Sequence, residues 1–284
     1  MNYTRLYDKN YNKVDNPYLL FHRYLEKDEN IRNIKKNKNE KNLNHLKCFK
    51  HIDIIEYMMN ESNKAYNPNK NISDIIKNMK NYEVKTIHIK QDCNMVIGLG
   101  QVSVSETSMT LHHIYGIPYM PGQALKGITR SFIINEYFDG KEEQALKDDD
   151  FINIFGIEGK NNKLGKVGKI IFFDSYPVDE INCKMDIMNN HYNDYYLGKR
   201  NLDDRQNPVP IKFMTICDTK FNINIAIKNK DNESLKGKLL EKLKKIDIEN
   251  ILDATVECVK QALVYSGIGA KTAVGYGYFD ICEE

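Results

Sequence analysis

Residues Gly267 to Gly277 read GIGAKTAVGYG and place four glycines around Lys271. Glycine allows positive φ angles and close approach to the main chain, so the cluster predicts a specialised loop. The preceding residues, 248–266, place apolar side chains at the period of an amphipathic helix, and residues 276–282 read as a closing strand. The order helix, glycine loop, strand therefore ends the chain.

This order excludes the common nucleotide-binding loops. A Walker A loop lies between a strand and a helix and has glycine directly before its lysine, whereas here Ala270 precedes Lys271. The dinucleotide fingerprint fails because Thr272 stands at its third glycine position. The remaining alternative is a tight turn whose glycines serve packing alone.

Composition indicates a soluble globular chain of one or two domains, with 284 residues, 41% hydrophobic and 28% charged. No apolar run approaches the roughly 20 residues that span a bilayer, and the N-terminus has no signal-like apolar segment. Six cysteines lie without a C-x-x-C pair, which favours reduced thiols and a cytoplasmic location. The only short metal grouping, His45, Cys48 and His51, lacks a fourth ligand, so no metal or other cofactor is expected.

Net charge is only +2, so any contact with nucleic acid must be local. The richest basic run lies between Arg32 and Lys50. Either a solvated linker or an RNA site fits this run, and the linker is the preferred interpretation.

The order of predicted elements indicates an α+β, ferredoxin-like fold. Residues 1–82 read as a helical extension, with segments at 18–29, 48–60 and 72–81, and residues 83–284 as the second domain. The second domain gives β-α-β-β-α-β from strands near 84–90, 168–174, 221–228 and 276–282 and helices at 121–138 and 248–266. Further strands at 94–104 and 209–216 and an aromatic loop at 176–207 would decorate this core.

A second informative segment begins the first of these two helices. Pro121 and Gly122 suit a helix start, and Leu125, Ile128 and Phe132 form an apolar stripe. Lys126 and Arg130 are four residues apart and share another face. Cations beside free backbone N–H groups at a helix N-terminus bind phosphate, although an ordinary exposed helix face explains the pattern equally well.

The segment Ile117–Arg130, IPYMPGQALKGITR, resembles the P-G-S-S-L-K-G-x-x-R motif of RAMP proteins of CRISPR effector complexes. The Gly267–Gly277 stretch resembles their glycine-rich loop. Segments between them, at 168–177, 185–196 and 208–213, are similar to the sixth-subunit family of type III-B (Cmr) complexes, and the resemblance covers residues 95–282. The chain departs from the motif at Gln123-Ala124, where paired serines are usual.

The resemblance implies an RRM-like RAMP domain that binds guide RNA near its 3′ end and takes part in antiviral RNA targeting. Its implied partners are guide and target RNA, the other RAMP subunits and the small helical subunit, with no membrane. The cutting aspartate belongs to a different subunit in this family, so the chain is not expected to be an enzyme. The implied RNA-binding residues are Gly122, Gln123, Lys126, Arg130, Gly267, Gly269, Lys271, Thr272, Gly275 and Gly277.

Phosphate and sugar contacts suit a guide of arbitrary sequence, because they do not depend on the bases. The alternative function is a RAMP-type endoribonuclease that processes CRISPR repeat RNA with His112 or His113 as general acid or base. Because consecutive residues of an extended segment face opposite sides, these histidines are not expected to act as a pair. The same interpretation assigns Asp174 and Asp186 to capping rather than metal binding, and Tyr176, Tyr192, Tyr195 and Tyr196 to a core or subunit contact rather than base stacking.

Overall fold

The chain forms two compact units whose segments interleave along the sequence. The computed structural model describes residues 16–19, 21–22, 52–101, 107–159, 164–190, 198, 209–237, 239, 243, 248 and 250–282. The first unit comprises residues 1–67, 96–118 and 180–217, and the second comprises 68–95, 119–179 and 218–284. Helix α5 (Ile52–Tyr66) belongs to the first unit and helix α6 (Pro68–Asn78) to the second, while the boundary at residue 82 stays a prediction.

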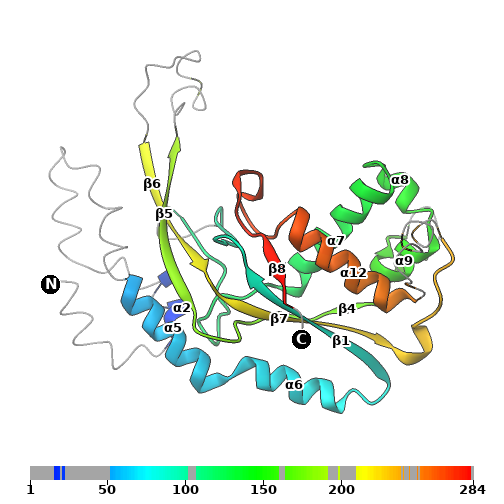
Figure 1. Cartoon of the computed structure of the whole chain (residues 1–284), viewed down its shortest axis with the longest axis horizontal. Helices are drawn as coiled ribbons and strands as arrows, with labels where there is room; N and C mark the ends of the chain where they lie inside the picture. The colour runs from blue at the N-terminus through cyan, green and yellow to red at the C-terminus, as the bar shows by residue number, and fades with distance from the viewer. Residues whose placement is uncertain are drawn as a thin grey trace, which may run out of the picture. The chain divides into compact units, whose positions relative to one another are not determined.

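The second unit contains a four-stranded antiparallel sheet in the order β4-β7-β1-β8 (Figure 1). Its strands are β1 (Tyr82–Gln91), β4 (Ile171–Phe172), β7 (Lys220–Lys228) and β8 (Phe279–Ile281). Helix α7 (Gly122–Tyr137) lies between β1 and β4 in the chain, and α12 (Ile251–Tyr265) between β7 and β8. The β-α-β-β-α-β order predicted from the sequence is thereby confirmed.

Apolar side chains of β1 and β7 alternate so that one face of the sheet is buried. The buried apolar side chains on this face are Ile87, Ile89, Phe221, Ile223, Ile225 and Ile227. Helix α12 covers the face, since Lys85 on the same side of β1 pairs with Asp253 of α12. Helix α7 packs along α12, where the Tyr137 hydroxyl donates to the Gln261 side chain at 3.0 Å.

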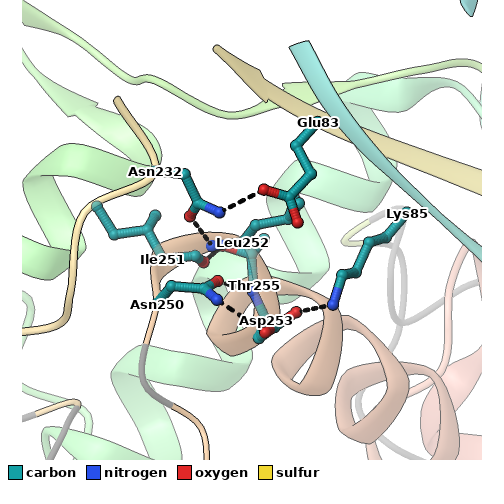
Figure 2. A network of polar contacts seen from close by, with 8 residues as sticks. All are labelled: Glu83, Lys85, Asn232, Asn250, Ile251, Leu252, Asp253 and Thr255. Atoms are coloured by element: carbon teal, nitrogen blue, oxygen red, sulfur yellow. Dashed lines mark hydrogen bonds and ion pairs between the residues drawn. The ribbon is translucent and has the colours of Figure 1, made fainter. Parts of the chain in front are cut away.

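A polar network holds the N-terminus of α12 against the sheet (Figure 2). The Asn250 side chain caps the helix by accepting from the backbone N–H of Asp253 at 2.8 Å. Asn232 accepts from the N–H of Leu252 at 3.1 Å and donates to the Glu83 carboxylate at 2.8 Å. Two orphan N–H groups of the first turn are thus satisfied by side chains.

Replacing Asn250 with alanine should lower the free energy of unfolding by about 1 kcal/mol, because the capping oxygen is removed. Urea unfolding followed by circular dichroism measures this change. Asn250→Ser keeps a capping oxygen and should recover most of the stability. Equal stability of the alanine variant and the unmodified chain would show that this cap contributes nothing.

In the first unit, β5 (Asn182–Asn190) and β6 (Val209–Cys217) form an antiparallel hairpin. Helix α5 packs on β5, where the Asn60 side chain bonds both the N–H and the carbonyl of Ile181 at 2.8 and 2.9 Å. The predicted loop at 176–207 is therefore wrong for residues 182–190. Their asparagine and methionine content carries weak strand propensity, and pairing with β6 supplies the stabilisation instead.

The sequence-based prediction is also wrong at other short elements. A strand is predicted at residues 94–104, but residues 94–101 do not form one. Between α7 and β4 the chain adds unpredicted short elements: α8 (Glu142–Ala145), α9 (Asp149–Phe155), β2 (Gly156–Ile157) and β3 (Lys166–Val167). Such elements are too short for a periodic pattern. The helices expected near 48–60 and 72–81 are present as α5 and α6, and near 18–29 the described helix is α2 (Pro17–Leu19).

Within the described ranges, none of the helices has the length and hydropathy required to cross a bilayer.

Candidate RNA-binding site

The two predicted phosphate-binding segments both belong to the second unit and lie beside opposite edges of its sheet. Gln91, at the end of β1, pairs with Phe279, so the glycine loop that precedes β8 lies beyond this end. The start of α7 is tied to Asp174, directly after Phe173, whose N–H donates to the carbonyl of Asn224 near the middle of β7 at 3.2 Å. Since β4 and β8 are opposite edges of the sheet, three strand spacings of about 4.8 Å, or roughly 14 Å, separate them.

Gly122 is required at the start of α7 by close packing. A Cβ at this position would lie 2.2 Å from the carbonyl oxygen of Phe172. The backbone N–H of Gly122 donates to the Asp174 carboxylate at 2.8 Å. The premise that this N–H is free for phosphate is therefore wrong, whereas the capping role preferred for Asp174 is confirmed.

Arg130 is already engaged by neighbouring side chains of the second unit. Its guanidinium donates to Glu142 at 2.5 Å and lies 5.4 Å from the centroid of the Phe151 ring. Lys126, one turn earlier on α7, is half-buried and forms no ion pair with a described residue, and Gln123 is exposed. Lys126 is thus the cation of this segment that is better placed to bind an anion.

The glycine loop is closed by backbone contacts at its base. The N–H of Ile268 donates to the Gly277 carbonyl at 2.8 Å, and the N–H of Gly277 donates to the Asn94 carbonyl at 2.9 Å. All four glycines have positive φ angles, of 70° at Gly267, 97° at Gly269, 91° at Gly275 and 77° at Gly277. Gly267 and Gly277 are buried, whereas Gly269 and Gly275 are exposed. Packing therefore explains two of the glycines, and the other two lie on the surface of the loop.

Lys271 stands at the centre of this loop in a left-handed conformation, with φ 65° and ψ 26°. A residue with a Cβ pays a free-energy cost for this conformation, and such strain concentrates at functional sites. Its ammonium lies 5.9 Å from the centroid of the Tyr276 ring, and the short helix η5 (Thr272–Val274) follows directly. The Tyr278 hydroxyl donates to the Thr272 carbonyl at 3.1 Å, and this bond ties the loop to the residue just before β8.

Sequence reasoning missed the residues that anchor these segments. Asn94 bonds Gly277, and the Cys93 sulfur accepts from the N–H of Tyr278 at 3.1 Å. Asp174 also influences the start of α7 electrostatically: burial raises the pKa of the nearby Tyr119 hydroxyl, and the Asp174 charge raises it further. Neither Cys93 nor Asn94 belongs to a local motif, so no pattern in the sequence signals these two anchors.

The Asp174 carboxylate opposes the binding of a second anion at the start of α7. We expect Asp174→Asn to raise affinity for single-stranded RNA by about threefold, because a charge at a helix N-terminus contributes about 0.3–1 kcal/mol. Asparagine still accepts from Gly122, so the free energy of unfolding should change by less than about 1 kcal/mol. Fluorescence anisotropy with a labelled RNA, beside urea unfolding, measures both quantities. Weaker RNA binding in a stably folded variant would place the phosphates elsewhere.

His112 and His113 lie in a turn of the first unit, and the prediction for their side chains is wrong. Their rings are stacked, with centroids 5.1 Å apart and planes inclined by 21°. The segment is not extended: the N–H of Gly116 donates to the His112 carbonyl at 2.6 Å and closes a turn. Turning of the backbone, rather than strand alternation, decides where the two rings lie.

Some of the other aromatic, acidic and metal-ligand residues singled out in the sequence lie in the part of the chain that the structure describes, and others lie outside it. Tyr176 is buried and stacks on Tyr119 with centroids 5.6 Å apart, and Asp186 accepts from the adjacent N–H of Ile187 at 2.8 Å. In the portion of the chain that the structure describes, no three His, Cys, Asp or Glu side chains form a metal-binding group. Outside this portion lie the basic run of residues 32–50, His45, Cys48, His51, Tyr192, Tyr195 and Tyr196.

Known proteins are similar to this chain in sequence and in fold. The chain is 29% identical over 246 residues to the CRISPR system Cmr subunit Cmr6 of Pyrococcus furiosus, covering 66% of this chain and 65% of that protein. It is 26% identical over 220 residues to the CRISPR system CMR subunit Cmr6 of Saccharolobus solfataricus, covering 75% and 63%. The matches thus span just under two thirds of the length of these relatives.

A solved structure agrees at the level of the fold. A chain from the cryo-EM structure of the type III-B Cmr-beta bound to cognate target RNA aligns with 99% of this chain and 86% of its own length, at a TM-score of 0.55 and 19% identity. The RAMP superfamily profile matches residues 88–280, which include both glycine-bearing segments. This match covers more than half of the sequence, and the chain therefore belongs to the RAMP superfamily.

Proposed function

We propose that this chain is a non-catalytic RNA-binding subunit of a type III-B (Cmr) CRISPR effector complex, acting in antiviral RNA targeting. The observation that carries the proposal is the similarity to two Cmr6 proteins, over 66% and 75% of this chain. Its partners would be guide RNA near the 3′ end, target RNA, the other RAMP subunits and the small helical subunit.

The geometry of the second unit supports binding to the phosphates and sugars of RNA. Lys126 and Lys271 belong to segments of the second unit that lie beside opposite edges of the sheet. Exposed Gly269 and Gly275 let an RNA strand approach the main chain closely, and Gln123 offers an amide donor in place of a serine hydroxyl. A net charge of only +2 provides little long-range attraction, so neighbouring subunits would supply much of the affinity.

Co-purification with the products of the neighbouring genes tests this proposal. A tagged full-length chain should recover other RAMP subunits together with RNA that carries CRISPR repeat sequence, and sequencing of that RNA identifies the bound end. The RNA affinity of the isolated chain should fall as salt rises, because phosphate binding releases counterions. Recovery of neither subunits nor repeat-derived RNA would overturn the assignment.

The stacked imidazoles of His112 and His113 support one alternative function, that of an endoribonuclease that processes CRISPR repeat RNA. A purified chain would then cleave repeat RNA, and both His112→Ala and His113→Ala would reduce cleavage. Intact repeat RNA after prolonged incubation with the folded chain would exclude this alternative.

A further inference from the structure

Four aromatic rings of the first unit form a contiguous group, the aromatic stack, in which three rings are stacked and the fourth is tilted, and neither RNA-binding segment includes it. The rings follow the order His113, His112, Tyr115, Tyr66. Centroids of His112 and Tyr115 are 4.3 Å apart with planes inclined by 16°, and those of Tyr115 and Tyr66 are 5.6 Å apart at 40°. With the 5.1 Å and 21° between the two histidines, two successive ring pairs are stacked, and the third pair, Tyr115 with Tyr66, is tilted.

Hydrogen bonds from two other segments hold this stack in place. The Asn16 side chain donates to the carbonyl of His113 at 2.7 Å and to that of Ile114 at 2.9 Å. Ser62 of α5 donates to the carbonyl of Tyr115, so the helix that carries Tyr66 is tied to the turn. The turn itself is closed by the N–H of His112, which donates to the Ile117 carbonyl at 2.8 Å. These bonds fix the backbone that carries the rings, and the N–H of Tyr115 also donates to the His112 ring at Nδ1, at 3.3 Å.

Both ends of the stack reach the protein surface. Tyr66 is 46% exposed, His113 is exposed, and the two rings between them are half-buried. A flat ring at the surface can accept one more flat ring on its outer face. A base of single-stranded RNA presents such a face, and stacking of bases on aromatic side chains tolerates any sequence.

We propose that this stack is a base-stacking site for single-stranded RNA, with His113 as the ring that receives a base. The inference rests on the proposed RNA-binding function, and it adds a base contact in the first unit to the phosphate contacts of the second. A nucleobase suits the site better than an apolar protein side chain, because imidazole and phenol rings combine flat apolar faces with polar edges. Those edges can hydrogen-bond the sugar or the base that follows.

Two ligands that differ only in their bases test the proposal on the full-length chain. The first is a single-stranded oligoadenylate, and the second is an oligonucleotide of the same length with abasic ribose at every position. We expect His113→Ala to weaken oligoadenylate binding by about fivefold or more and to leave abasic binding unchanged. His113→Phe keeps a flat ring and removes the imidazole nitrogens, so it should bind oligoadenylate within about twofold of the unmodified chain.

Tyr57→Ala provides the matched control, because Tyr57 lies on α5 in the same unit, is 55% exposed and stands outside the stack. It should leave both affinities unchanged. Tyr66→Ala removes the opposite end of the stack and provides a second variant if His113→Ala does not fold, as judged by thermal unfolding. The salt dependence separates base stacking from phosphate binding: His113→Phe should keep the slope, whereas removing the partner of one phosphate lowers it by about 0.7.

Four results would overturn the stacking site. Equal decreases in affinity for oligoadenylate and abasic ligand would identify a phosphate contact instead. A lower Tm with unchanged oligoadenylate affinity would show that the stack serves the turn alone. Reduced affinity in Lys126→Ala and Lys271→Ala, with none in His113→Ala, would remove the stacking site while the proposed RNA-binding function stands; absence of all RNA binding by the chain would remove both.

Discussion

Replacing Gly277 with alanine should lower the free energy of unfolding by about 3 kcal/mol or more. A Cβ at this position would lie 2.0 Å from the carbonyl oxygen of Ile268, and the φ angle of 77° is itself unfavourable for alanine. The atom that it meets is backbone, so no side-chain rotation can relieve the clash. Relief requires movement of the base of the glycine loop, which would break the bond between Ile268 and Gly277.

Gly275→Ala separates the free-energy cost of the steric clash from that of the positive φ angle. Gly275 has a φ angle of 91°, but no heavy atom lies within 4 Å of its Cβ position. This variant should therefore be destabilised by only about 1–2 kcal/mol, from backbone strain. Urea unfolding of both variants, with circular dichroism as the probe, gives the difference between them. Equal stabilities would show that the base of the loop rearranges at no cost.

Removing both Lys126 and Lys271 should weaken binding of single-stranded RNA by about 100-fold, with roughly tenfold from each, since a hydrogen bond to a charged group contributes about 1.5–3 kcal/mol. The slope of log K against log salt should fall by about 0.7 for each phosphate that is no longer neutralised. Anisotropy titrations of the single and double alanine variants at several salt concentrations measure both effects. The two lysines belong to segments on opposite edges of the sheet, so their effects on the binding free energy should add.

Three further variants separate a loss of RNA binding from effects on folding and on overall charge. Lys271→Gly removes the amine and relieves the left-handed strain at φ 65°, so the free energy of unfolding should stay within about 1 kcal/mol while RNA binding falls. Lys271→Arg keeps the charge and should retain most of the affinity. Lys230 is exposed beyond β7, at the other end of the sheet, and Lys230→Ala should leave affinity unchanged. If Lys230→Ala lowered RNA affinity as much as Lys271→Ala, the effect would come from the overall charge and not from a localised binding site.

Local signals were sufficient for the main elements of the sheet domain. The apolar period before Gly267 predicts α12, alternation over residues 84–90 predicts β1, and Pro121-Gly122 predicts the start of α7. The same reasoning failed at β5, where strand formation depends on pairing with β6 rather than on composition. It failed again at the two histidines, because a local strand rule was applied to residues that form a turn.

Local sequence patterns predict the order of the main helices and strands and the two glycine-bearing segments, because periodicity and positive φ angles depend on residues close together in the chain. Which groups of those segments are already engaged depends on contacts between residues far apart in the chain. Asp174 reaches Gly122 across 52 residues, Glu142 and Phe151 engage Arg130, and Tyr66 joins the stack from a distant helix. Such partners are selected by packing, and packing leaves no local pattern in the sequence.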